Sequence, residues 1–295
     1  MSGREILDGL ARVLRRHPPA PTRLPRAVRP TLQRFKQFRR ASQAVLLGGL
    51  ADDWPDRQNL SLARLRERFG NRLISGMPTK HGQLNNDPRA GVIFETVRFG
   101  DYVDRLERGD WPEFYLAAPG ETWFPELRDE VRAPEYCRDA SWRISRIWLS
   151  APQMSAPLHR DVAQNIFVQL IGRKRFYLYP AAATPWLYSN PVRSALPNYS
   201  RFDPEKPDYE RFPLSRALQP LEVILEPGDA IYLPSGWWHQ VRSLDVSLSV
   251  SFFFADGALA FAVRAAEFVK RMRGLEIYGL ETRRRASLAG SSQAQ

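Results

Sequence analysis

Two histidines and an aspartate are the residues of this 295-residue chain best suited to hold a metal ion. His159 and Asp161 stand two positions apart at the start of a predicted strand, so their side chains are expected to point to the same face. His239 follows much later, directly after a Pro-Ser-Gly turn and two tryptophans. Two neutral imidazoles and one carboxylate form the facial triad of non-haem iron(II) centres, which leaves further coordination positions open. The three residues therefore predict an iron(II) site.

A buried cation is predicted shortly after the first two of these residues. Lys174 shares one face of a predicted strand with two apolar residues, Phe176 and Leu178. An ammonium group that points into an apolar layer is costly unless it meets an anion. A dicarboxylate cosubstrate would supply that anion. Arg173 and Arg175 alternate to the other face and are expected to be solvated.

Each of these residues also has a purely structural interpretation. His239 could be a core histidine with a satisfied hydrogen bond. Asp161 could cap a turn, and Lys174 could extend along its apolar stem to solvent. These interpretations must all hold independently, whereas one metal site with a bound cosubstrate explains the whole set.

Short β-rich runs separated by Gly, Pro, Asn and Asp must supply the strands that position these residues. A series of such strands without helical crossovers is typical of an antiparallel jelly roll. In the last run the polar residues Ser247, Ser249 and Ser251 alternate with apolar ones, so this polar face is expected to line a cavity. The runs lie at 143–151, 165–171, 174–180, 221–227, 230–234 and 246–254.

Helical and irregular segments are expected around this β region. Residues 1–40 read as a basic helix with a Pro/Arg-rich arm, residues 41–256 as the β-type domain with its N-terminal α/β additions, and residues 281–295 as a disordered tail. Helices are predicted from 62 to a stop at Gly70 and over 123–131. Residues 181–220 form a long excursion between strands, of the kind that is usually functional.

The last predicted helix, over 257–280, carries an apolar stripe. Phe261, Ala265, Phe268, Met272 and Leu275 are spaced like the seam of a helix that packs against another helix. The stripe fits docking on the chain's own core as well as it fits a homodimer.

Composition limits the class of protein. The single cysteine excludes an internal disulfide framework and a cysteine-rich zinc site, which favours a reducing, cytoplasmic location. Neither a secretory signal nor an apolar run long enough for a membrane span is present in the sequence. The net charge of +11 is concentrated in the two terminal regions. Binding of nucleic acid through these regions is possible, but solvated helix faces are the favoured interpretation.

Three sequence blocks together resemble the Jumonji-C (JmjC), cupin-like family of iron(II)- and 2-oxoglutarate-dependent oxygenases. They are H-x-D-x-x-Q-N-x-F-x-Q-x-x-G-x-K-R at 159–175, DPEKPDYERFP at 203–213 and PGDAIYLPSGWWHQV at 227–241. The motifs are most similar to those of the asparaginyl hydroxylase that acts on hypoxia-inducible factor. The resemblance extends upstream through 51–55 and 115–127 and covers most of residues 40–280.

The resemblance implies a double-stranded β-helix, mainly β with flanking helices, in which His159, Asp161 and His239 hold iron(II). It also implies that Lys174 pairs with the C5 carboxylate of the cosubstrate 2-oxoglutarate. Asn165 and the Tyr115 hydroxyl are expected near the same cosubstrate.

Two positions depart from the family pattern. Ala156 stands where the family often has Thr or Ser, so Ser155 or a water would have to replace that contact. Ser251 aligns with an asparagine of that asparaginyl hydroxylase, which weakens a second contact to the cosubstrate. With the metal ligands and Lys174 all present, we interpret these departures as tuning.

The implied activity is hydroxylation of an unactivated C–H bond with O2, coupled to decarboxylation of 2-oxoglutarate to succinate. A protein or peptide side chain is the leading substrate class; a small molecule, such as an amino acid or natural-product intermediate, and an RNA nucleoside are alternatives. A non-catalytic cupin that binds a partner through the basic termini is a hypothesis of a different class. A cupin isomerase or hydrolase with another divalent metal is a third, and it has no evident need for Lys174.

Overall fold

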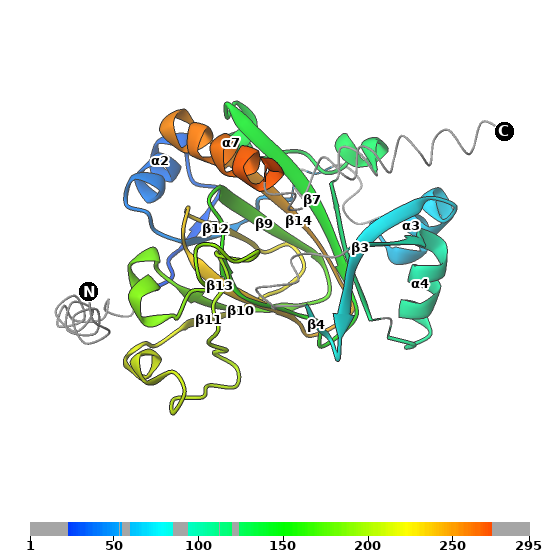
Figure 1. Ribbon diagram of the computed structural model, residues 1–295. Helices are drawn as coiled ribbons and strands as arrows, with labels where there is room; N and C mark the ends of the chain where they lie inside the picture. Colours follow the sequence, from blue (N-terminus) through cyan, green and yellow to red (C-terminus); the bar gives the residue numbers. More distant parts are fainter. Residues whose placement is uncertain are drawn as a thin grey trace.

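The computed structural model describes residues 23–52, 54, 60–84, 94–111, 113–119 and 124–272. Within these residues fourteen strands form one continuous sheet that curves into two facing layers (Figure 1). The predicted mainly β jelly roll with flanking helices and a C-terminal helix is confirmed. The predictions for residues 1–22 and 273–295, including Leu275 and the end of the helix predicted over 257–280, lie outside the described residues. The division of the chain at residues 40 and 256 stays a prediction.

The first layer contains most of the strands that were predicted from alternating apolar residues. Its neighbours pair mainly in antiparallel fashion, and β1 at one end is parallel to β2. In order across the layer the strands are β1 (Arg26–Val28), β2 (Val45–Gly48), β12 (Ala230–Leu233), β9 (Gln164–Ile171), β14 (Ser247–Ala255), β7 (Trp142–Ser150), β6 (Phe114–Pro119) and β3 (Leu73–Lys80), with β5 (Glu95–Arg98) beside β3.

The second layer continues from β3 and faces the first. Its strands in order are β4 (Gln83–Leu84), β8 (Ser155–Arg160), β13 (Trp238–Ser243), β10 (Lys174–Tyr179) and β11 (Leu221–Leu225). An apolar cluster occupies part of the space between the layers; Phe167 and Ile231 belong to it from the first layer and Phe176, Leu178 and Val241 from the second. Side chains that point into this interior are the ones available for a site.

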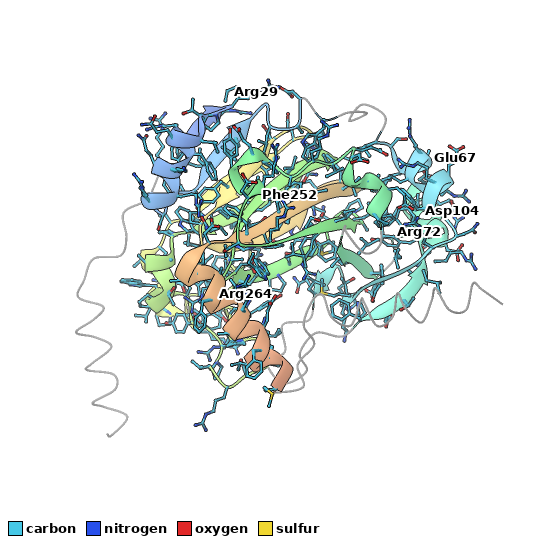
Figure 2. All side chains as sticks on the ribbon, turned by 90° about the horizontal axis from the view of Figure 1, so that it is seen from above. Arg29, Glu67, Arg72, Asp104, Phe252 and Arg264 are labelled. Atoms are coloured by element: carbon cyan, nitrogen blue, oxygen red, sulfur yellow. The ribbon has the colours of Figure 1, made fainter. Side chains whose placement is uncertain are left out.

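Helices cover the outer face of the first layer. The main ones are α2 (Leu32–Arg40), α3 (Leu62–Phe69) and α4 (Phe99–Glu107), and α3 ends at Gly70 as predicted. Figure 1 shows α3 and α4 beside β3 and α2 at the opposite end of the layer. Arg66 of α3 is ion-paired with Asp104 of α4, a residue at the edge of the molecule in Figure 2.

The predicted helix over 123–131 is wrong. The described residues of this range, 124–131, form one 3-10 turn, Pro125–Arg128, which is followed after an irregular stretch by the short helix α6 (Glu135–Arg138). Phe124 and Leu127, three positions apart, are the buried apolar residues that contact the core. That spacing suits a single 3-10 turn, and Pro134 restricts the residue before it to extended conformations.

The long excursion between β10 and β11 is present as predicted. It contains two 3-10 turns, Ala181–Trp186 and Pro213–Ala217, and packs on the outer face of the second layer. Trp186, Phe202 and Phe212 of the excursion form one apolar cluster with Leu158 of β8 and Trp238 of β13. The excursion is therefore fastened to two strands of the sheet by a small core of its own.

The C-terminal helix α7 (Gly257–Met272) packs on the sheet with a face different from the predicted stripe. Ala260 and Val263 are the helix residues buried against the sheet. Phe261, Phe268 and Met272 of the stripe are 75%, 62% and 70% exposed, so docking of the stripe on the described core is wrong. Within the described residues, none of the helices has the length and apolar character needed to cross a bilayer.

A homodimer through the exposed stripe stays a prediction. We expect light scattering to give the mass of two chains and the variant Phe268→Glu to give the mass of one, because a carboxylate is costly in an apolar seam. Val192→Glu, which changes another strongly exposed apolar residue in the excursion, is the matched control and should not alter the mass. A single-chain mass for the unaltered protein would contradict the prediction.

Candidate metal centre

One pairing of strands brings the two predicted histidine ligands together. In the antiparallel pair β8–β13, His159 lies directly opposite His239, and the two ring centroids are 4.2 Å apart. Asp161 completes the group: one ligand atom from each of the three residues lies within 4.8 Å of the others. The Nε2 atom of His239 is 3.5 Å from a carboxylate oxygen of Asp161. The arrangement can hold one metal ion.

His159 and Asp161 do not stand at the start of a strand, as the sequence suggested. His159 is near the end of β8, and Asp161 follows the strand in the turn toward β9. The pairing of β8 with β13 shifts register between His159 and Ala156, and Pro157 falls in this irregular stretch. Proline has no N–H to donate to a ladder and argues against a strand in a sequence pattern, which explains why β8 was not predicted.

Backbone contacts hold the turn that carries Asp161. The Gly236 N–H donates a hydrogen bond of 2.9 Å to the Asp161 carbonyl, and the Ser235 hydroxyl donates to the Val162 carbonyl at 2.6 Å. Gly236 has a φ of 77°, a left-handed conformation that favours glycine. The Pro-Ser-Gly turn before β13 thus fixes Asp161 and His239 relative to each other.

The tautomers of both histidines suit metal binding. The Nδ1 atom of His159 is 2.8 Å from the Pro157 carbonyl, and Nδ1 of His239 is 3.2 Å from the Trp237 carbonyl. A carbonyl can only accept, so Nδ1 carries the proton and the Nε2 lone pair remains for a metal. Burial, helped by the nearby His159, lowers the pKa of His239 to about 4, which keeps its ring neutral at physiological pH.

The excursion supports His159 from the outside. Its segment 198–200 runs along β8: the Ser200 N–H donates to the Leu158 carbonyl and the Arg160 N–H to the Asn198 carbonyl. The Tyr199 ring stacks on the His159 ring with centroids 5.1 Å apart. No sequence pattern had singled out Tyr199, because its contact depends on how the excursion folds back.

A second contact from the excursion holds β13. Arg242 on the outer face of the strand is ion-paired with Glu205, and both side chains are largely buried. Gln240, on the same face, donates to Asp203 at 2.9 Å and to Glu205 at 3.2 Å. A one-residue slip of a strand turns every side chain to the opposite face. These contacts therefore keep His239 pointing into the interior.

The fully buried Lys174 lies on the same inner face as His239. It pairs with Ser243 across β10–β13, four residues along the strand from His239, which corresponds to roughly 13 Å. Its Nζ atom makes no hydrogen bond with any described residue and lies 5.5 Å from the ring centroids of Tyr115 and Phe167. A buried ammonium group in this position fits a bound carboxylate.

The other predicted cosubstrate residues lie in one chain of contacts with Lys174. Tyr115 of β6 stacks on Trp148, with ring centroids 5.4 Å apart. The indole N–H of Trp148 donates to the Ser251 hydroxyl, which also accepts a hydrogen bond from Asn165. Trp148 was missed, although alternation along β7 places it on the inner face. Its two partners come from other strands, which periodicity cannot reveal.

Buried polar atoms remain unsatisfied beside these contacts. Within the described residues, Oδ1 of Asn165 and the Ser249 hydroxyl have no hydrogen-bond partner. Ala156 packs with Tyr115 and Met77, so a methyl group occupies the position where a hydroxyl was expected. Ser155, the adjacent residue of β8, points to the opposite face and does not replace it.

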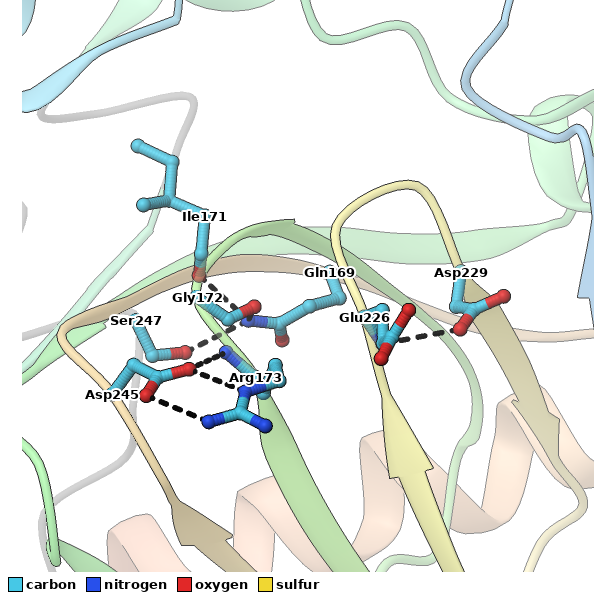
Figure 3. A network of polar contacts seen from close by, with 8 residues as sticks. All are labelled: Gln169, Ile171, Gly172, Arg173, Glu226, Asp229, Asp245 and Ser247. Carbon is cyan, nitrogen blue, oxygen red and sulfur yellow. Dashed lines mark hydrogen bonds and ion pairs between the residues drawn. The ribbon is translucent and has the colours of Figure 1, made fainter.

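A network of polar contacts surrounds the turn that leads into Lys174 (Figure 3). Gly172 has a φ of 66°, and a Cβ there would lie 2.1 Å from the Val246 carbonyl oxygen. The Gln169 amide donates to the carbonyls of Ile171 and Gly172 and to the Ser247 hydroxyl. Arg173, the residue after Gly172, is ion-paired with Asp245 at the surface.

The residues fit the groups that the sequence suggested. Two imidazoles with free Nε2 atoms and a carboxylate suit iron(II), with room for further ligands. The unpaired Lys174 ammonium suits the far carboxylate of a dicarboxylate. Both sets of side chains face the same interior between the two sheet layers.

Comparisons with known proteins agree with this geometry. The model of a family described as "Cupin-like domain" matches residues 31–258. The chain is 31% identical over 242 residues to lysine-specific demethylase 8 of Xenopus tropicalis and 32% over 243 residues to that of Danio rerio, each time over 79% of this chain. It is 30% identical over 180 residues, 55% of this chain, to tRNA wybutosine-synthesizing protein 5 of Gallus gallus. The matches span 53%, 58% and 55% of these relatives, in the order named.

The contact between Glu205 and Arg242 predicts a large stability effect. Glu205→Ala leaves a buried guanidinium group without its counter-charge, which should lower the free energy of unfolding by about 3 kcal/mol in a urea titration. The matched control is Glu222→Ala, which removes the partner of Arg175 in a more exposed ion pair and should cost less than about 1 kcal/mol. Equal effects of the two variants would contradict a special role of the Glu205 contact.

The buried Lys174 predicts a pH dependence of stability. Burial lowers its pKa to about 7, from 10.5 in an unfolded chain. Between these values the unfolded chain binds more protons, so this group alone makes the ligand-free protein more stable as pH rises from about 7 to about 10. The stability advantage of Lys174→Met over the unaltered protein should therefore shrink over this range in urea titrations. A constant difference would show that Lys174 is not buried as described.

Proposed function

Because the chain belongs to the cupin-like (JmjC) domain family, we propose that it is an iron(II)- and 2-oxoglutarate-dependent oxygenase that hydroxylates an unactivated C–H bond. The observation that carries the proposal is the combination of a His-Asp-His group and an unpaired buried lysine in one interior. The proposal includes the ligand roles of His159, Asp161 and His239 and the cosubstrate role of Lys174.

Each residue of the chain has a defined task under this proposal. The two histidines and Asp161 would hold the metal from one side and leave its other side open. Iron(II) and 2-oxoglutarate, when bound, supply oxygen activation coupled to decarboxylation of 2-oxoglutarate to succinate. Lys174 would orient the cosubstrate through its far carboxylate, and the surrounding apolar cluster would exclude water from the reacting atoms.

The alternatives explain fewer of the observations. A cupin isomerase or hydrolase with another divalent metal needs the three ligands but has no use for a buried ammonium group 5.5 Å from two aromatic rings. A non-catalytic binding protein requires neither the three metal ligands nor the buried ammonium group. Burying a charge without a partner is costly, so a function that supplies its counter-charge is favoured.

The substrate class we propose is a protein or peptide side chain. Two of the relatives named above are lysine-specific demethylases, a name that describes an action on lysine. The relative named for tRNA wybutosine synthesis keeps an RNA nucleoside as the second candidate, together with the positive charge at the ends of this chain. Since the chain spans only part of the length of these relatives, their substrates do not transfer directly.

The experiment that tests the proposal measures succinate. Protein purified without oxygen and supplied with iron(II), 2-oxoglutarate and then O2 should release succinate, and Asp161→Ala should abolish this release. Lys174→Met should raise the 2-oxoglutarate concentration required by about 10- to 100-fold, because a charge-assisted contact is lost. The same reactions with a peptide library, followed by mass spectrometry, should yield a product with one added oxygen that depends on 2-oxoglutarate.

Arg175→Met is the matched control for the lysine variant. Arg175 is the next residue on β10, points to the other face and is ion-paired with Glu222. Its loss should leave the 2-oxoglutarate requirement unchanged. Equal requirements in the Lys174→Met variant and the unaltered protein would remove Lys174 from the cosubstrate site, and absence of succinate under all conditions would refute the oxygenase.

A further inference from the structure

A cavity of about 460 Å³ lies on the outer face of the first sheet layer, away from the metal centre. It is bounded by strands β7 and β14 and by the segment from Phe124 to Arg138, where the predicted helix is replaced by irregular chain. Cavities that bind small molecules commonly measure about 300–1,000 Å³. The cavity is thus large enough for a ligand of its own.

The two faces of β7 and β14 separate this cavity from the metal centre. Trp148 and Ser251 point inward, where they contact each other. Ile147 and Phe252, the residues next to them in sequence, point outward and line the cavity. Figure 2 shows Phe252 in the middle of the molecule, above the strands. A ligand in the cavity would therefore lie behind the sheet and would not compete with a cosubstrate in the interior.

The floor of the cavity is apolar. Leu127, Ile147, Val250 and Phe252 are buried members of the main apolar cluster and line the cavity together. Val131, Ile144 and Phe253, which also line the cavity, are only partly buried, and covering their exposed apolar surface would be favourable. The floor is suited to an alkyl chain.

The rim of the cavity is cationic. Arg132, Arg138 and Arg143 line it, and among the described residues of the lining Asp129 is the one acidic residue. Within the described residues none of these arginines takes part in an ion pair; Arg132 and Arg143 donate to the backbone carbonyls of Asp129 and Arg138. Burial raises the pKa of the Cys137 thiol, which also lines the cavity, so it stays neutral and adds no negative charge.

We propose that this cavity binds an anionic amphiphile, with an alkyl chain on the apolar floor and a carboxylate at the three arginines. The charge complementarity of the rim and the apolar character of the floor together specify this class. A neutral hydrocarbon would leave the guanidinium groups without a partner, and a small inorganic anion would leave the floor uncovered.

Isothermal titration with dodecanoate, below its micelle concentration, tests the proposal on the full-length protein. We expect saturable binding of one molecule per chain. 1-Dodecanol should bind at least tenfold more weakly because it lacks the charge, and inorganic phosphate should show no binding because it lacks the chain. Absence of saturable dodecanoate binding, or equal affinity for dodecanoate and dodecanol, would overturn the proposal.

Variants locate the binding at this cavity. Arg138→Glu combined with Arg143→Glu changes two exposed side chains and should weaken dodecanoate binding at least tenfold. Ser145→Phe, which fills the cavity from β7, should weaken it without a change of charge. Arg201→Glu, an exposed arginine of the excursion, is the matched charge control and should have no effect. Unaltered affinity in both cavity variants would place the binding elsewhere and refute the site.

Discussion

The antiparallel pairing of β8 with β13 is the constraint on which the rest of the site depends. It sets His159 opposite His239, although the two residues belong to strands distant in the chain. Three features accompany this pairing of β8 with β13: the irregular stretch at Pro157, the turn at Gly236 and the contacts of Arg242. A metal site of three side chains tolerates little displacement, because each ligand must reach the same point. The contacts around β8 and β13 hold the three side chains of the group in their positions relative to one another.

The interior between the layers combines two opposing tendencies. Its apolar cluster stabilises the fold, whereas a charged Lys174 beside it is destabilising unless an anion compensates its charge. The turn at Gly172, which has no room for a Cβ, leads directly into the strand that begins with Lys174. Proteins commonly accept such local cost at functional positions and compensate for it elsewhere. Here the compensation comes from the large apolar contacts on both outer faces of the sheet.

The sequence predicted those features that depend on neighbouring residues. Alternation identified the strands around Asn165, Lys174 and Ser251, and residue chemistry identified the candidate metal ligands. Features that depend on distant pairing were not predictable. Strand β8 was not recognised because Pro157 lies within it. The contact of Trp148 with Ser251 joins two different strands, so the sequence of either strand does not show it. Tyr199 reaches His159 only because the excursion folds back over β8. The helix expected over 123–131 does not form, and the buried residues Phe124 and Leu127 belong to one short 3-10 turn instead.

The attachment of the excursion has a consequence for how such a protein can diversify. It begins and ends at β10 and β11, neither of which carries one of the proposed metal ligands, so changes in its length need not disturb the β8–β13 pair that holds His159 and His239. Its constrained positions are those that contact the sheet, such as Tyr199, Phe202 and Glu205. Its remaining surface is free to vary. A chain built in this way can acquire new specificities by insertion and deletion while its inherited chemistry stays intact.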